Sequence, residues 1–112
     1  MTTTQGSGHL EFLRALEQQR AAYAASLAGR ISGMELLWKA VCARTADADD
    51  LARLERCAHS LAGSGAVFGH DSLSARARGL ERELHRIVER GSPGEGEAAN
   101  VGAAIAALRR CL

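Results

Sequence analysis

The stretch LARLERCAHSLAGSGAVF, residues 51–68, has an apolar residue at every third or fourth position, and this period decides the fold class. Drawn as an α-helix, the segment carries these residues as one stripe: Leu51, Leu54, Ala58, Leu61 and Phe68. Carboxylates at positions 47, 49 and 50 precede the stripe and suit the exposed amides of a helix N-terminus. Gly69 follows as a stop signal.

Segments of the same helical period lie on both sides of this one, at 10–41, 73–87 and 98–112. Gly29 interrupts the first of them, which could be two helices or one long kinked helix, and of these we expect two helices. Gly91 predicts the end of the helix at 73–87, and Ser92, Pro93 and Glu95 predict the start of the last helix. No segment alternates with the period of a strand. The sequence therefore predicts an all-α protein: an up-and-down four-helix bundle with an additional N-terminal helix, as one domain over 9–112 after a disordered lead-in at 1–8.

Composition narrows the function classes. Apolar residues make up 46% of the chain, and 14 basic and 13 acidic residues leave a net charge of +1, which offers no electrostatic footprint for nucleic acid or anionic lipid. The three cysteines are widely spaced, and we expect buried free thiols in a reducing compartment. No apolar run is long enough to span a bilayer. With one apolar stripe per helix, we expect a cytoplasmic monomer that contacts neither nucleic acid nor membrane.

His59 is the residue on which the functional interpretation depends. On the helical wheel its side chain points roughly 145° away from the centre of the apolar stripe, so we expect it in solvent and not in the core. Small residues clear the outer face around it of bulky groups: Ala52, Ala62, Gly63 and Ala66. Glu55 and Arg56 lie one turn before the histidine. A glycine inside a helix costs about 1 kcal/mol relative to alanine. Gly63 therefore predicts close approach of another surface, and Gly65, on the core side, predicts tight packing.

An exposed imidazole is partly neutral near pH 7 and is a competent nucleophile. It can form a phosphoramidate, and phosphoryl transfer demands little beyond positioning and charge stabilisation. The sequence has no phosphate-cradling glycine loop, kinase motif or metal-binding histidine pair. An exposed histidine on an otherwise bare helical bundle is thus competent to carry a phosphoryl group. Nothing in the sequence provides an ATP site, so we expect neither a kinase nor a cofactor.

Residues 58–69, AHSLAGSGAVFG, resemble the signature of histidine-containing phosphotransfer (HPt) domains of bacterial two-component phosphorelays. In that family leucine follows the histidine by two residues and glycines by four and ten, as Leu61, Gly63 and Gly69 do here, and Leu80-Glu81 matches a downstream pair. The resemblance implies that His59 accepts a phosphoryl group from a receiver domain or a hybrid histidine kinase. It also implies that Mg²⁺ resides in the partner receiver.

The sequence departs from the family at Ala62, where a lysine is common. Substitutes for its charge are sought on the following helix, where Glu81 should lie beside the phosphorylated histidine. The candidates are Arg78, Arg82 and His85, and the alternative is that these residues form only a solvated charged face. The missing lysine also leaves open a second function, an HPt-like adapter that binds a receiver or kinase without carrying phosphate.

Overall fold

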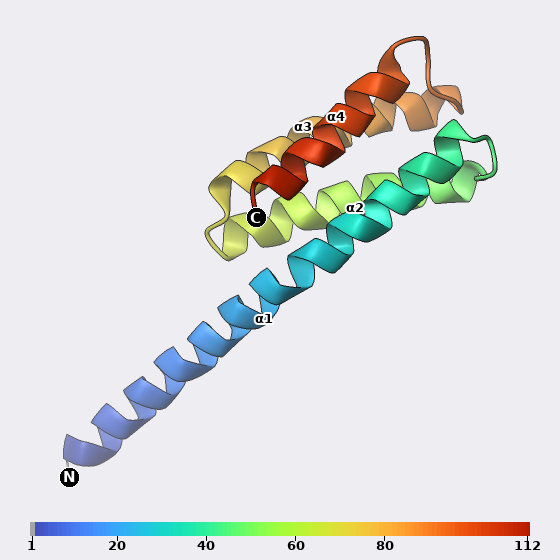
Figure 1. Ribbon diagram of the computed structural model, residues 1–112. Helices are drawn as coiled ribbons and strands as arrows, with labels where there is room; N and C mark the ends of the chain where they lie inside the picture. The colour runs from blue at the N-terminus through green and yellow to red at the C-terminus, as the bar shows by residue number, and fades with distance from the viewer. Residues whose placement is uncertain (1) are drawn as a thin grey trace.

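The structure, a computed structural model, describes residues 2–112, with side chains from Gly8 onward. The described residues form four helices and no strand, which confirms the all-α class (Figure 1). In chain order the helices are α1 (Thr2–Cys42), α2 (Ala48–Val67), α3 (Asp71–Arg90) and α4 (Glu97–Arg110). Each helix packs against the next one along the chain, and α4 returns to contact α1, so the four close into a bundle.

The expectation of two helices before residue 45 is wrong, because α1 is continuous from Thr2 to Cys42. A Cβ atom added at Gly29 or at Gly33 would meet nothing within 4 Å, so both glycines lie on the open side of the helix. Their cost is about 1 kcal/mol each, which is too little to break a helix whose opposite side is buried. Among residues 2–112 there is accordingly no additional N-terminal helix beyond the four.

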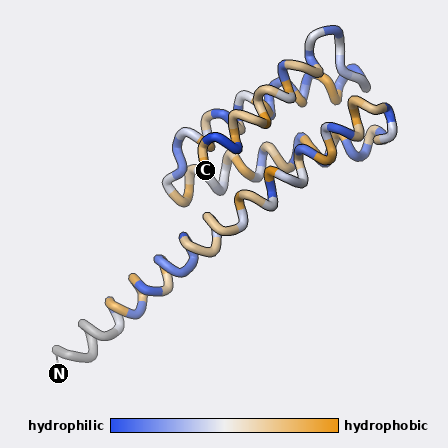
Figure 2. The backbone as a smooth tube through the Cα atoms, in the orientation of Figure 1, coloured by the Kyte–Doolittle hydropathy of each residue, from blue (hydrophilic) through white to orange (hydrophobic). Residues whose placement is uncertain are grey.

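The N-terminal half of α1 projects beyond the bundle (Figure 1). We call residues 8–22 of this half the overhang. Leu10, Phe12 and Leu13 are 54%, 60% and 46% exposed, and Figure 2 shows hydrophobic positions continuing along the projection. The backbone is already helical at Thr2, within the stretch 1–8 expected to be a disordered lead-in, and Met1 lies outside the described residues.

The core lies between the second half of α1 and the three shorter helices. Two polar contacts fix α1 there: the Tyr23 hydroxyl is 2.8 Å from Ser64 Oγ on α2, and the Trp38 indole donates to the carbonyl of Ala98 on α4 at 3.1 Å. The fully buried large side chains come from all four helices: Leu27, Ile31, Met34, Leu54, Leu61, Leu73, Leu80, Leu84, Ile87, Val101, Ile105 and Leu108. Aliphatic side chains therefore supply most of the packing, as the composition predicted.

The helix boundaries follow the sequence signals unevenly. Asp47 caps α2 in a reciprocal capping box with Asp50, and Gly91 ends α3 in the left-handed conformation, both as predicted. The start predicted from Ser92 is wrong, because α4 begins at Glu97. Gly96 has φ +83° immediately before it, a conformation that a helix cannot contain.

The cysteines are free, but the expectation that all three are buried is wrong. Cys42 is exposed at the end of α1, and Cys57 and Cys111 are half-buried. None of the described helices combines the length and the apolar character that a bilayer crossing requires.

Candidate functional site

His59 lies in the middle of α2, on the side turned away from the core, as the wheel predicted. Its side chain is 76% exposed. Leu54, Ala58 and Leu61 of the same helix are buried, so the apolar stripe and the imidazole point in opposite directions.

Close packing between α2 and α3 brings a second set of side chains to this imidazole. A Cβ added at Gly65 would be 3.4 Å from Ser74 Cβ and 3.5 Å from the carbonyl oxygen of His70, both ordinary van der Waals distances, so the two helices pack closely at this glycine. The buried Ser74 hydroxyl donates to the carbonyl of Ala62 at 2.6 Å. The packing role predicted for Gly65 is thus confirmed, and the two helices run side by side from their common turn.

His59 Nδ1 is 2.7 Å from a carboxylate oxygen of Glu81 on α3. A carboxylate only accepts hydrogen bonds, so the proton of this bond must sit on Nδ1. When the ring is neutral, Nε2 therefore carries the lone pair. The contact selects one tautomer of His59 and one nucleophilic nitrogen.

His59 and Glu81 share a depression of about 400 Å³ with Ala62, Gly63, Arg78 and Arg82. Neither Arg78 nor Arg82 forms an ion pair with a described residue. The Arg82 guanidinium folds over Gly79, where an added Cβ would lie 3.9 Å from Nη2. Two free guanidinium groups beside a nucleophilic nitrogen make this depression suited to an anion.

His85, the third predicted substitute for the lysine, does not line this depression. Its Nδ1 is 2.7 Å from Glu55 on α2, and its Nε2 is 3.2 Å from Glu89 on α3. The hydrogen bond that His85 donates to Glu55 raises the pKa of His85 above its ordinary 6.5, the charge of Glu55 raises it further, and Glu89 adds to the rise. The sequence places Glu55 one turn before His59 on the same helix, but it gives no signal that Glu55 bonds to His85 on the next one.

Only some of the residues expected to form the exposed face around His59 are exposed there. Gly63 and Ala66 are exposed and Ala52 is half-buried. Ala62 is 3% exposed, so its assignment to the outer face is wrong: α3 covers that flank of α2. Arg56 faces the other way, into a groove of about 340 Å³ between α1 and α2.

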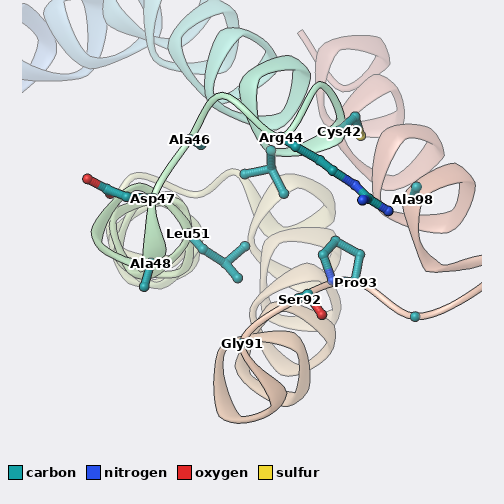
Figure 3. Close-up of a pocket in the computed structure, with 12 residues that line it drawn as sticks. Cys42, Arg44, Ala46, Asp47, Ala48, Leu51, Gly91, Ser92, Pro93 and Ala98 are labelled. Carbon is teal, nitrogen blue, oxygen red and sulfur yellow. The ribbon is translucent and has the colours of Figure 1, made fainter.

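Another cavity, of about 580 Å³, lies between the α1–α2 and α3–α4 connections (Figure 3). Figure 3 shows Arg44 extending across it toward Ala98. It contains none of the predicted site residues and no histidine. Among the described side chains there is also no group of three or more histidine, cysteine or acidic residues that could hold a metal ion.

Comparison with protein families matches residues 10–112 to the family described as Hpt domain. Comparisons with curated proteins and with solved structures gave no match. The matched region contains α1 from Leu10 onward, the other three helices and every residue of the site around His59.

Proposed function

Because the chain belongs to the Hpt domain family, we propose that His59 is its phosphoryl-accepting histidine. Hpt domains are phosphocarrier modules of two-component systems, and they interact with receiver domains and kinases. In the proposed reaction, His59 takes a phosphoryl group from a phospho-aspartyl receiver domain or a histidine kinase. It then passes the group to another receiver in the phosphorelay.

The hydrogen bond between His59 Nδ1 and Glu81 carries this proposal. The Nε2 lone pair attacks the phosphorus atom, a P–N bond forms, and the P–O bond to the donor aspartate breaks and leaves a carboxylate. The ring keeps its Nδ1 proton and becomes a phospho-imidazolium, whose positive charge the Glu81 carboxylate stabilises. When the P–N bond breaks in the onward transfer, its electron pair returns to Nε2 and the ring leaves as neutral imidazole. Because neutral imidazole is a good leaving group, the same contact favours this step.

The two arginines of the depression supply the charge that the lysine provides in other family members. Arg78 and Arg82 line it together with His59, whereas His85 is held by two carboxylates. Guanidinium groups bind phosphoryl oxygens well because they offer paired N–H donors. The Mg²⁺ ion of the reaction is expected in the partner receiver domain, where it would neutralise the aspartyl phosphate.

A transfer assay with a phosphorylated receiver domain tests the proposal. The wild-type chain should gain one label that is labile in acid and stable in alkali, as a P–N bond is. Fragmentation mass spectrometry should place the label on the peptide that contains His59. A label that is alkali-labile, or that maps to Ser60 or Ser64, would contradict the assignment.

Replacing both arginines of the depression should weaken phosphoryl acceptance. In Arg78→Ala/Arg82→Ala the rate should fall by roughly ten- to hundredfold, because the developing charge loses its two cationic donors. Rates with a saturating phosphorylated receiver measure this loss. Arg76→Ala is the matched control: it removes an exposed arginine of α3 that is not part of the depression, and it should transfer at the wild-type rate. Equal losses in the control and in the double variant would indicate a general charge effect instead.

Replacing Gly63 should separate transfer from stability. A Cβ at this position would meet nothing within 4 Å, so packing does not require the glycine. Gly63→Gln should raise the free energy of unfolding by about 0.5–1 kcal/mol through helix propensity. It should also slow transfer by roughly tenfold, because the longer side chain obstructs the approach to His59. Denaturation and transfer rates measure the two effects, and a destabilised Gly63→Gln chain would mean that the glycine serves packing.

A second candidate function is that of an adapter, which binds a receiver or kinase without being phosphorylated. The alanine at position 62, where a lysine is common in the family, favours it. Binding and signalling output in His59→Ala separate the two functions. A phosphocarrier loses its output while it still binds. An adapter keeps both.

A further inference from the structure

Four side chains beside the proposed phosphorylation site form a square across the α2–α3 interface. Glu55 and His59 lie one turn apart on α2, and Glu81 and His85 lie one turn apart on α3. His59 pairs with Glu81, and His85 pairs with Glu55, each at 2.7 Å between Nδ1 and a carboxylate oxygen. Both histidines thus bond to the opposite helix through the same ring nitrogen.

The same four residues have a second way to pair. Residues four apart on a helix are neighbours, so Glu55 is within reach of His59, and Glu81 is within reach of His85. His85 shows the effect of such a neighbour: the carboxylate of Glu89, four residues further along α3, lies 3.2 Å from its Nε2. A ring with a carboxylate at each nitrogen must carry a proton on both, and it then has no lone pair.

The two histidines differ in how many ring nitrogens contact a carboxylate. His85 uses both, whereas His59 uses only Nδ1 and its Nε2 is free. The carboxylate nearest along the helix that could occupy Nε2 is Glu55. Glu55 is turned away because it bonds to His85, and its side chain is only 23% exposed in that position.

We propose that His85 is a positioning residue of the phosphorylation site, which holds Glu55 away from His59 and so leaves Nε2 without a carboxylate partner. The inference rests on the proposed function for its biological meaning but not for its geometry. The charged groups that face His85 are Glu55 from α2 and, from α3, Glu81, Arg82, Arg86 and Glu89. The raised pKa of His85 agrees with an imidazolium that is shared by Glu55 and Glu89.

Ring ¹⁵N chemical shifts of His59 test this inference near neutral pH without any phosphoryl donor. In His85→Ala the ratio of unprotonated to protonated Nε2 should fall roughly twofold, the effect of one released carboxylate at this spacing. Adding Glu55→Gln should restore the wild-type ratio, and His85→Arg, which can still hold Glu55, should keep it. Glu89→Gln is the matched control, because it removes a carboxylate from His85 without releasing Glu55, and it should leave the ratio unchanged.

An unchanged ratio in His85→Ala, or a fall that persists after Glu55→Gln is added, would overturn the inference. The two proposals also fail separately. A chain that is phosphorylated on His59 at the normal rate but shows no change of ratio contradicts only the role of His85. A chain whose ratio responds as expected but that never accepts a phosphoryl group contradicts only the proposed function.

Discussion

A His59→Gln chain should accept phosphoryl groups at least on the order of a thousandfold more slowly than the wild-type chain, and it should fold as well. Glutamine can still donate a hydrogen bond to Glu81, but the lone pair of its amide nitrogen is delocalised and does not attack phosphorus. The replaced side chain is 76% exposed, so the free energy of unfolding should change by less than about 0.5 kcal/mol. Transfer from a phosphorylated receiver and chemical denaturation measure the two quantities.

The second histidine of the square provides a matched control for this substitution. The Nδ1 of His85 bonds to a glutamate at the same distance as that of His59. His85→Gln makes the same chemical change on α3, one turn beyond Glu81. Its glutamine can still hold Glu55, so acceptance should stay within about twofold of wild type. An acid-labile label that persists in His59→Gln but disappears in His85→Gln would move the phosphorylation site to α3.

Two leucines on the same side of α1 should differ widely in their contribution to stability. Leu27 is 2% exposed within the bundle, and Leu13 is 46% exposed on the overhang. Leu27→Ala should lower the free energy of unfolding by about 2–5 kcal/mol, since it leaves a cavity among packed side chains. Leu13→Ala should lower it by no more than about 0.5 kcal/mol. Denaturation at two protein concentrations measures both.

The concentration series also tests what covers the overhang in solution. If Leu13→Ala costs more than about 1.5 kcal/mol, and more at the higher concentration, then a second copy of the chain packs against this face. That outcome would contradict the monomer expected from one apolar stripe per helix.

The sequence predicted what depends on a single helix. The apolar period placed α2 and α3, the left-handed glycine at position 91 ended α3, and the wheel oriented His59 toward solvent. Each of these features is set by residues within a few turns of one another. The continuous α1 was missed because the cost of Gly29 was given more weight than the buried stripe on the opposite side of the helix.

Features that depend on how two helices face each other could not be predicted in the same way. A wheel gives the direction of a side chain from its own helix axis, but not how closely the neighbouring helix approaches or in which register. Ala62 was therefore expected on the surface although α3 covers it. For the same reason the sequence suggested Arg78, Arg82 and His85 equally, and only the register of α3 against α2 separates the arginines from the histidine.

The overhang also has a hydrodynamic consequence. The radius of gyration is 17.8 Å, whereas a compact chain of this length would have about 13 Å. A single copy should therefore tumble anisotropically, diffuse more slowly than a sphere of equal mass, and elute early from a gel-filtration column. Elution volume alone would overstate its mass, and light scattering, which measures mass independently of shape, is the appropriate way to count its subunits.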